Sequence, residues 1–417
     1  MTTVGTGISG QPAHLRLVAL DAARGLAVFG ILVVNIWSFV WGFEYLRYGV
    51  LPDAPSLPDR IAVFAVALIA EQKFYPIFAF LFGAGFALQT RSLRKMLPDW
   101  RTVRSRYRGR LKWLLGLGVL HGTLIWAGDI LTIYGIAGFF VLGVAGARLR
   151  MVRARFWKWF AVWCFLIAFS AAMAWPSYQA EDARDQVLSV ISDVWATHAI
   201  YTQGTVIEHA LQRIADYAAV TGSSVFLLPH LLVLFLLGIL SVRLGWMTSP
   251  QRHAPMWRRV RAVGYLIGIP FNMLWAGVAL TEAMAPLGMP GYGMLVYAFL
   301  PAGGSFLAAA YFASVMLARG ESLRRLAAWL APVGRMSLTN YLSQSLLGVL
   351  LLQGVGLGLG TAAAASPALL LIIAAAIMLF QIMFSRWWIS RHRQGPIESL
   401  YRYHHATGNH AHRSVPE

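Results

Sequence analysis

The sequence predicts an all-α membrane protein, a polytopic bundle of about ten transmembrane helices, from three observations. First, 58% of the 417 residues are hydrophobic and only 12% are charged, whereas ordinary soluble domains carry about 25% charged residues. Second, the 16 Trp and 23 Phe side chains suit the interfacial belts and lipid-facing surfaces of a membrane protein. Third, apolar stretches long enough to cross a bilayer alternate with short basic runs.

The apolar stretches give the expected elements in order, because about 20 apolar residues make one helical span. The shortest connection joins spans three and four, and it predicts a tight hairpin at 128–130. The ten predicted spans cover residues 24–43, 62–88, 112–128, 130–147, 157–175, 223–242, 261–281, 294–317, 337–358 and 367–385.

The charge pattern predicts how the bundle is oriented. The formal net charge is +18, and the basic residues gather in the runs that follow spans two, four, six, eight and ten. All of these runs fall on one side, so the positive-inside rule predicts that both termini are cytoplasmic. Because the basic residues are distributed in this way, contact with the lipid bilayer accounts for the positive net charge. We therefore expect the lipid bilayer as a partner and no nucleic acid.

We expect one integral membrane domain over residues 1–417, with a disordered start at 1–15 and a cytoplasmic tail at 386–417. The 176–222 loop is the longest on the extracytoplasmic side. It is acidic, and its residue spacing predicts amphipathic helices lying over the end of the bundle. Residues 59–72 are expected to form an interfacial helix, because the stretch after the first loop is long for one span.

Three absences narrow the class of protein. Residues 1–13 lack the basic region and cleavage site of a signal peptide, so the first helix is expected to stay as a span. The single cysteine, Cys164, lies in an apolar run, so we expect neither an intramolecular disulfide nor a metal site. The chain also lacks the phosphate-binding loop of nucleotide-hydrolysing pumps.

His121 and Asp129 are candidate catalytic residues near the extracytoplasmic end of span three. A carboxylate beside an imidazole orients the ring and raises its basicity, which suits a general base for a hydroxyl or an amine. The alternative is a buried His–Asp pair that only closes the hairpin.

Asn35 is the third candidate catalytic residue, at the extracytoplasmic end of span one. Its amide can donate a hydrogen bond to a carbonyl oxygen and stabilise an oxyanion. The alternative is an interhelical hydrogen bond with a structural role.

Arg16, Arg24 and Arg335, with Asp21, form a candidate binding site for a phosphorylated ligand at the cytoplasmic side. Asp21 lies about 21 Å from Asn35 along the first helix, so we expect it to position Arg24 and not to act in the chemistry. The alternative for each arginine is anchoring of the helix ends at the membrane surface.

Five further polar residues lie within the predicted spans, where ionisable groups are costly and usually face a partner or a cavity. Lys73 is expected either to meet a carboxylate on another element or to reach the interface with its long side chain. Asn340 and Gln344 form a polar stripe on span nine, whose start Ser337 or Thr339 can cap. The five are Glu71, Lys73, His230, Asn340 and Gln344, and for His230 a satisfied core histidine is the favoured interpretation.

Four motifs run from residue 16 to about residue 402, and together they resemble those of YeiB-like bacterial membrane proteins. They are Arg16…Leu20-Asp21-x-x-Arg24-Gly25…Val34-Asn35; Lys73-Phe74-x-x-x-Phe78-x-x-Leu81-Phe82-Gly83-x-Gly85; His121-Gly122…Gly128-Asp129-Ile130-Leu131; and Gly334-Arg335-Met336-Ser337-Leu338-Thr339-Asn340-Tyr341-Leu342-x-Gln344-Ser345 with Gly395-Pro396-Ile397-Glu398.

The resemblance implies a bacterial inner-membrane protein of a poorly characterised family. That family is similar to a broader group of transmembrane acyltransferases that includes lysosomal heparan-α-glucosaminide N-acetyltransferase, which uses acetyl-CoA from the cytoplasmic side. Asp21, Arg24 and Asn35 match the start that the group shares. The lysosomal enzyme has a catalytic histidine soon after its asparagine, whereas this chain has no histidine between Asn35 and His121. Either His121 takes that role or the chemistry differs.

The leading functional hypothesis is an O- or N-acyltransferase that moves an acyl group from cytoplasmic acyl-CoA, in the first place acetyl-CoA, to an extracytoplasmic glycan or small acceptor. The runner-up is a small-solute transporter or permease that uses the same buried polar groups. A non-catalytic scaffold is the third alternative, and a homo-oligomer is compatible with all three.

Overall fold

The computed structural model describes residues 13–43, 48–51, 55–179, 183–286, 292–318, 320–364 and 366–400, and every regular element within them is a helix. The predicted all-α class is therefore confirmed. The helices are α1 (Ala13–Asn35), α2 (Ser38–Trp41), α3 (Leu57–Ile69), α4 (Phe74–Met96), α5 (Trp100–Leu124), α6 (Leu131–Leu142), α7 (Leu149–Gln179), α8 (Ala183–Gln203), α9 (Val206–Ser223), α10 (Leu228–Arg243), α11 (Ala254–Met284), α12 (Tyr292–Leu317), α13 (Glu321–Arg335), α14 (Ser337–Leu352), α15 (Gly360–Ala364) and α16 (Pro367–Arg391).

The protein is a polytopic membrane helix bundle. Six described helices or helix pairs are long and apolar enough to cross a membrane, and α9 with α10, bent by 65°, would make a seventh. Each of the ten predicted spans overlaps a helix, but α6 has only 12 residues and α14 only 16. The count of ten therefore stays a prediction.

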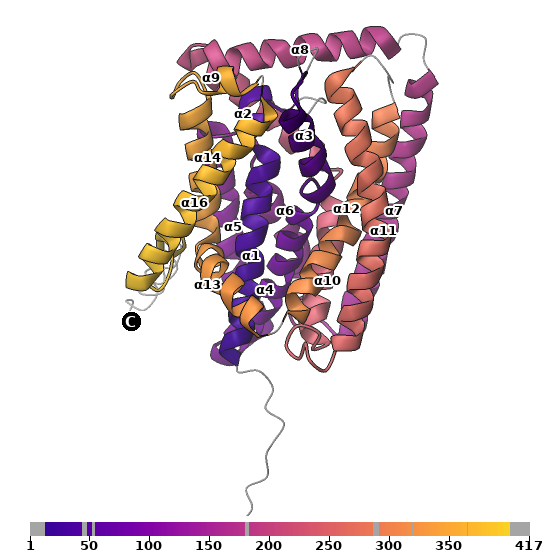
Figure 1. Ribbon diagram of the computed structural model, residues 1–417. Helices are drawn as coiled ribbons and strands as arrows, with labels where there is room; N and C mark the ends of the chain where they lie inside the picture. The colour runs from indigo at the N-terminus through magenta and orange to yellow at the C-terminus, as the bar shows by residue number, and fades with distance from the viewer. Residues whose placement is uncertain are drawn as a thin grey trace, which may run out of the picture.

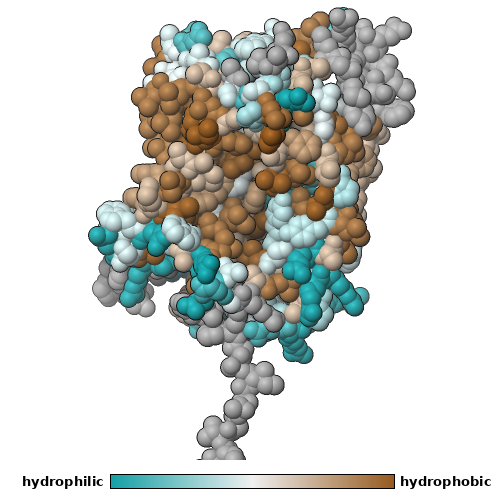
Figure 2. Space-filling model, viewed as in Figure 1, coloured by the Kyte–Doolittle hydropathy of each residue, from teal (hydrophilic) through white to brown (hydrophobic). Residues whose placement is uncertain are grey.

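The bundle has two distinct ends (Figure 1). Helix α8, which belongs to the 176–222 stretch, lies across one end, whereas α1 begins and α16 finishes toward the other end. Hydrophobic side chains cover the middle of the face shown in Figure 2, and hydrophilic ones gather toward the ends, most densely along the lower end. This arrangement is the one that a bilayer-spanning protein requires.

The predicted disordered start at 1–15 needs a correction. Helix α1 already begins at Ala13, within the expected disordered start, and α16 continues to Arg391, within the expected tail. Residues 1–12 and 401–417 lie outside the described part of the chain. The α16 extension carries an apolar and aromatic run, so helix formation continues past the predicted membrane boundary.

Helix α13 was not predicted as an element of its own. Its sequence is strongly amphipathic, and one face packs against α1 while arginines occupy the solvent face. In the sequence these arginines look like an ordinary basic connection, which hides the helical period. The element matters because it places Arg335 beside α1.

The predicted second span is broken. Helix α3 ends at Ile69 and α4 begins at Phe74, and between them Gln72 has φ +62°, the one positive φ of a non-glycine among the described residues. The expected helix at 59–72 thus exists as α3, which packs against α11 and α16. A left-handed conformation costs an L-residue about 1–2 kcal/mol and clusters at functional sites.

Candidate functional site

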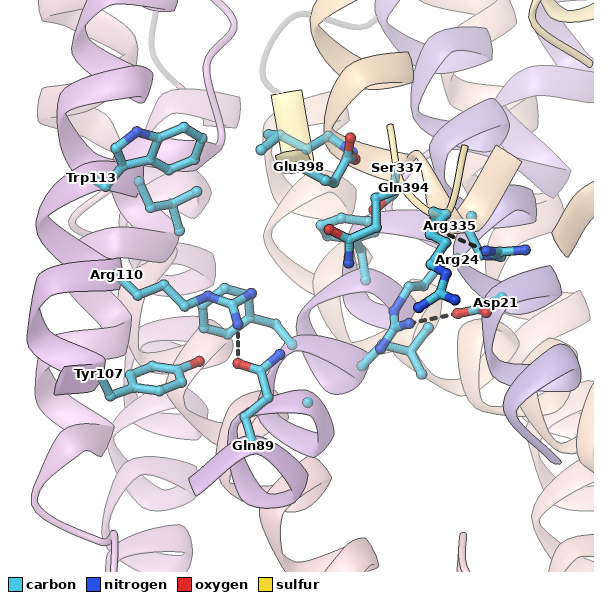
Figure 3. Close-up of a pocket in the computed structure, with 18 residues that line it drawn as sticks. Asp21, Arg24, Gln89, Tyr107, Arg110, Trp113, Arg335, Ser337, Gln394 and Glu398 are labelled. Carbon is cyan, nitrogen blue, oxygen red and sulfur yellow. Dashed lines mark hydrogen bonds and ion pairs between the residues drawn. The ribbon is translucent and has the colours of Figure 1, made fainter. Parts of the chain in front are cut away.

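A cavity of about 410 Å³ lies near the end of the bundle where α1 begins, and Figure 3 shows its lining. We call it the basic cavity, because four arginines line it with only two carboxylates. The arginines are Arg24, Arg110, Arg335 and Arg393, and the acids are Asp21 and Glu398. Two of the three arginines predicted to bind a phosphorylated ligand, Arg24 and Arg335, are thus brought together. The side chain of Arg16 lies outside the described part of the structure.

Local contacts fix three of the four guanidinium groups of the basic cavity. Arg24 donates from Nη1 to Oδ1 of Asp21 over 2.8 Å, which is the positioning role expected of this aspartate. Arg335 donates from Nη2 to the carbonyl of Arg393 over 2.7 Å. Arg110 bonds the side-chain oxygen of Gln89. A guanidinium carries five N–H groups, so the contacts of Arg24 and Arg335 leave further donors for a ligand.

Helix α5 supplies the opposite wall of the basic cavity. Tyr107, Arg110 and Trp113 follow one another along this helix and face the side of Arg24 and Arg335 (Figure 3). The Arg110 guanidinium lies 5.5 Å from the centre of the Tyr107 ring. A flat aromatic wall beside several guanidinium groups suits a ligand that has both a ring and anionic groups.

Two glycines allow α1 and α13 to cross with their backbones in contact. A Cβ atom added at Gly334 would collide with the carbonyl of Asp21, and one added at Gly25 would collide with the carbonyl of Leu330. The glycines that follow Arg24 and precede Arg335 in the sequence motifs therefore have a packing reason. They bring the two arginines to one cavity.

Two glycines of the 73–85 motif, Gly83 and Gly85, have different structural roles. A Cβ at Gly83 would collide with the backbone of Phe235, so this glycine lets α4 pack closely on α10. Gly85 lines the basic cavity, and a Cβ there would lie 3.9 Å from Nη2 of Arg24. Gly83 thus allows the close packing of α4 on α10, and Gly85 leaves room in the basic cavity.

The start of α14 is capped by a residue that the sequence does not indicate. Glu398 Oε1 accepts from the backbone N–H groups of Leu338 (2.9 Å) and Thr339 (3.2 Å), and Oε2 accepts from the Thr339 hydroxyl (2.6 Å). The expected cap by Ser337 or Thr339 is therefore wrong. This contact explains why a tail motif accompanies the 334–345 motif, and it closes one side of the basic cavity.

A second cavity, of about 190 Å³, contains two of the predicted catalytic residues, Asn35 and Asp129. We call it the acidic cavity, because Glu71 and Asp129 line it while no lysine, arginine or histidine stands among its described lining residues. The amide of Asn35 has no hydrogen-bond partner within the described part of the chain. Its main-chain carbonyl accepts from Ser38 over 2.9 Å.

The acidic cavity lies where several helices end or break. Asn35 is the last residue of α1, Gln72 belongs to the break between α3 and α4, and Ser224 belongs to the bend between α9 and α10. The hairpin before α6 contributes Asp129. Interrupted helices are the usual way in which membrane proteins bring polar backbone and side chains to a buried site.

His121 and Asp129 are in contact. His121 Nδ1 lies 2.9 Å from Asp129 Oδ1, and both side chains are fully buried. They meet across the hairpin and not along one helix face, because α5 ends at Leu124 and α6 begins at Leu131. Oδ2 of Asp129 accepts from the backbone N–H of Thr132 over 2.7 Å, so the carboxylate also caps α6.

The other nitrogen of the His121 ring is buried without a hydrogen-bond partner among the described residues. His121 does not line the acidic cavity. Its ring centre lies 5.2 Å from that of Tyr341, which does. The Tyr341 hydroxyl donates to the Gly128 carbonyl over 3.0 Å and accepts from the Ile130 N–H over 3.2 Å. The histidine is therefore one aromatic ring away from the cavity.

A hydrophobic layer separates the two cavities. Its buried members are Ile31, Leu131 and Tyr341, and Phe74, Phe78 and Leu114 are among the side chains packed on them. Phe78 and Leu114 line the basic cavity, whereas Ile31, Phe74 and Tyr341 line the acidic one. This single hydrophobic cluster therefore forms the wall between the basic cavity and the acidic cavity.

His230, Asn340 and Gln344, three of the further polar residues predicted within the spans, all form side-chain hydrogen bonds. His230 Nδ1 lies 2.8 Å from the Tyr75 hydroxyl and Nε2 lies 2.9 Å from the Ser305 hydroxyl, so both ring nitrogens are bonded. Asn340 donates to Ser385 over 3.0 Å, and Gln344 donates to Gln381 over 2.9 Å. The polar stripe of span nine therefore ties α14 to α16.

Lys73 neither reaches the interface nor forms an ion pair across elements in the described structure. Its side chain is fully buried, and Nζ donates to the Ala67 carbonyl over 2.7 Å. The break before α4 turns this side chain back toward α3, which the span prediction did not anticipate. Glu71 accepts from the Tyr48 hydroxyl (2.6 Å) and from Nε1 of Trp275 (2.8 Å).

Sequence reasoning missed Arg110 and Arg393. Both belong to runs in which most arginines face solvent, so nothing in the sequence separates a cavity arginine from an anchoring one. A helical reading of residues 107–114 would have placed Tyr107, Arg110 and Leu114 on one face, and this is the signal that was available.

Comparison with known proteins supports the resemblance in the motifs. The family model described as "Protein of unknown function (DUF418)" matches residues 241–407. The uncharacterized protein YxaH of Bacillus subtilis is 28% identical over 403 residues, with 93% of each chain covered. The uncharacterized protein YeiB of Escherichia coli is 29% identical over 420 residues, which covers 93% of this chain and 95% of that one. This chain is therefore similar to YeiB-like membrane proteins of unknown function.

Proposed function

We propose that this protein is a transmembrane acyltransferase of the bacterial inner membrane, which takes an acyl group from cytoplasmic acyl-CoA and transfers it to an extracytoplasmic glycan or small acceptor. The observation that carries the proposal is the pair of cavities of different chemistry on one helix. Arg24 lines the basic cavity and Asn35 the acidic cavity, and the eleven-residue step from one to the other along α1 spans about 16 Å.

The basic cavity is the donor site in this proposal. Arg24, Arg110 and Arg335 would hold the phosphates of acetyl-CoA, since planar guanidinium groups bind phosphate with two parallel hydrogen bonds. Trp113 and Tyr107 offer flat surfaces for the adenine ring. The acyl end would pass the hydrophobic layer between Phe78 and Ile31, where an apolar chain loses no hydrogen bonds.

The acidic cavity is the acceptor site. Asp129 would accept a hydrogen bond from the Nδ1–H of His121, which leaves the unpartnered Nε2 as the base. This nitrogen takes a proton from the acceptor amine or hydroxyl, the acceptor bonds to the acyl carbon, and the carbon–sulfur bond of the thioester breaks. Asn35 would donate to the oxyanion. The thiolate leaves with the proton. Tyr341 must turn aside for His121 to reach the acceptor.

The direct test uses purified full-length protein in detergent. Calorimetric titration with acetyl-CoA should show binding that Arg24→Ala and Arg110→Ala weaken about tenfold or more, as expected for the loss of a charged hydrogen-bond pair. Arg108→Ala, an exposed neighbour on α5 outside the cavity, is the matched control. Absence of acetyl-CoA binding to the unmodified protein would refute the proposal.

The second test addresses chemistry. Protein bearing His121→Gln should bind acetyl-CoA normally and fail to transfer the acyl group, because Gln can bond Asp129 but cannot serve as a base. Transfer at the normal rate by this variant would remove His121 from the mechanism.

One observation favours the second candidate function, a small-solute transporter. The break before α4 and the bend before α10 both face the acidic cavity, and broken helices form the solute sites of many transporters. Uptake of a solute into proteoliposomes without any acyl donor would support this candidate against the first.

A further inference from the structure

We propose that the surface where the end of α16 meets α13 binds the headgroup of an anionic phospholipid. Four side chains form this surface, which we call the Trp–Arg rim: Trp329 on α13, and Arg386, Trp387 and Arg391 on α16. None of the four lines the basic cavity or the acidic cavity. The inference therefore depends on neither of the two candidate functions.

Each arginine of the rim lies beside the ring of a tryptophan. The guanidinium carbon of Arg386 is 4.4 Å from the centre of the Trp329 ring, and that of Arg391 is 5.0 Å from the centre of the Trp387 ring. A cation–π contact holds a guanidinium without occupying its N–H groups in hydrogen bonds. The rings therefore position two sets of donors that stay available for the oxygens of a phosphate.

No acidic side chain forms an ion pair with the arginines of the rim within the described structure. Helix α16 contains no Asp or Glu, and the single acid of α13, Glu321, pairs with Arg325 over 3.2 Å. Arg386 has no hydrogen bond or ion pair in the described part of the chain, and Arg391 donates to the Trp387 carbonyl over 3.3 Å. The rim thus combines positive charge with unused donors, and it suits an anionic ligand.

The tryptophans of the rim stand at the molecular surface. Trp329 is 51% exposed and Trp387 is 48% exposed, and neither indole N–H has a hydrogen-bond partner among the described residues. Tryptophan prefers the headgroup region of a bilayer, where its ring meets apolar chains and its N–H meets polar groups. Two exposed indoles beside two exposed guanidinium groups indicate that the rim lies at the depth of the headgroups.

An apolar face of α16 leads away from the rim. Ile372, Leu379 and Met383 are all more than half exposed, and their spacing puts them on the same side of the helix as Arg386. The opposite side, which includes Ala374, is buried. The eleven-residue step from Ile372 to Met383 spans about 16 Å, or about half of a hydrocarbon core of about 30 Å. This face has the length that the acyl chain of a lipid in one leaflet requires.

The combination of charge, indoles and apolar face identifies the class of ligand. A free phosphate would contact the arginines but would gain nothing from the apolar face, and a zwitterionic lipid would bring a positive charge of its own to the rim. A phospholipid with a net negative headgroup, such as phosphatidylglycerol, satisfies both parts of the site. Near a membrane surface one arginine favours an anionic lipid by about fivefold in affinity.

The test uses native mass spectrometry of the purified full-length protein in detergent. Phosphatidylglycerol and phosphatidylcholine with identical acyl chains are titrated separately, and we expect phosphatidylglycerol to bind at least about fivefold more tightly. Glycerol phosphate, which lacks the acyl chains, should not bind at the same concentrations. Equal affinity for the two lipids, or binding of glycerol phosphate as tight as that of phosphatidylglycerol, would overturn the proposal.

Three variants locate the binding at the rim. Arg386→Gln removes one charge and should weaken phosphatidylglycerol binding about fivefold, whereas Arg386→Lys keeps the charge and should retain most of the affinity. Ser390→Glu places a carboxylate one turn from Arg386 and should also weaken the binding, because it competes with the headgroup. The matched control is Arg259→Gln, which removes an exposed arginine near the start of α11 that has no ring contact in the described structure, and it should leave the lipid preference unchanged.

Thermal unfolding in detergent establishes which variants are folded. If Arg386→Gln does not fold, Ser390→Glu decides the question, because Ser390 is exposed and its hydroxyl bonds only the Trp387 carbonyl of the same helix. An unchanged preference for phosphatidylglycerol in folded Ser390→Glu would refute the site. An equal loss of affinity in Arg259→Gln would do the same, since it would mean that the lipid responds to the general positive charge of this end of the protein.

Discussion

Replacing Gly334 with alanine tests the contact on which the basic cavity depends. A Cβ at this position would lie 2.7 Å from the carbonyl carbon of Asp21 and 2.9 Å from the backbone nitrogen of Gly25, whereas ordinary contact begins at 3.4 Å. Because all of these are backbone atoms, no side chain can move aside, and α1 and α13 must separate by on the order of 1 Å. Overpacking of this kind costs about 1–3 kcal/mol, while the better helix propensity of alanine returns about 0.5–1 kcal/mol.

The assay compares Gly334→Ala with Gly116→Ala, a helical glycine on α5 whose added Cβ would meet nothing within 4 Å. We expect thermal unfolding in detergent to occur several degrees lower for Gly334→Ala and at or above the normal temperature for Gly116→Ala. If both variants unfold alike, the backbone contact between α1 and α13 is absent and the reasoning is refuted. Acetyl-CoA titration of Gly334→Ala supplies a second measurement, since the variant moves Arg335 away from Arg24.

The remaining predictions concern stability. Glu398→Ala removes the cap of α14 and should lower the free energy of unfolding by about 1–2 kcal/mol, whereas Glu321→Ala, an exposed acid on α13, should change it little; equal effects would contradict the cap. Asn340→Ala leaves Ser385 without this partner and should cost about 1–3 kcal/mol, measured by denaturant unfolding; a neutral result would contradict the interhelical network. Burial lowers the pKa of His198 on α8 below its usual 6.5, so the stability contributed by its neutral ring is present above that pH and lost as the pH falls through the lowered pKa; His198→Phe should flatten the acid side of a plot of melting temperature against pH, and an unchanged slope would contradict this.

Hydropathy and motif spacing predicted the class of fold and several residues of the two cavities. Two simple rules gave these predictions. An apolar run of sufficient length forms a helix, and charged residues at the end of such a run indicate the membrane boundary. They located Arg24, Asn35 and the 128–130 hairpin, because each lies at the end of an apolar stretch. The sequence placed His121 and Asp129 near the same end of span three, but their contact is established only by the structure, because the chain reverses between them.

The remaining features depend on contacts between distant parts of the chain. The cap of α14 comes from Glu398, about 60 residues later, and no local pattern connects the two. The break at Gln72 is a tertiary effect, because Gly304 of α12 packs against the Gln72 backbone. Arg110 belongs to a run where positive charge has a general explanation. Each of these required knowledge of which helices are neighbours.

The hydrophobic layer between the two cavities sets a different structural requirement for each of the two candidate functions. Ile31, Phe78 and Tyr341 pack between the cavities, so in the described conformation a ligand in one cavity does not touch a ligand in the other. An acyltransferase needs only a narrow passage for an apolar chain, whereas a transporter must open a path wide enough for a polar solute. Phe78→Ala removes a ring from this layer and leaves every arginine in place. The acyltransferase hypothesis therefore predicts retained acetyl-CoA binding with faster hydrolysis of the donor by water. The transporter hypothesis predicts a solute leak that needs no donor, and measuring both in the same proteoliposomes would separate the two functions.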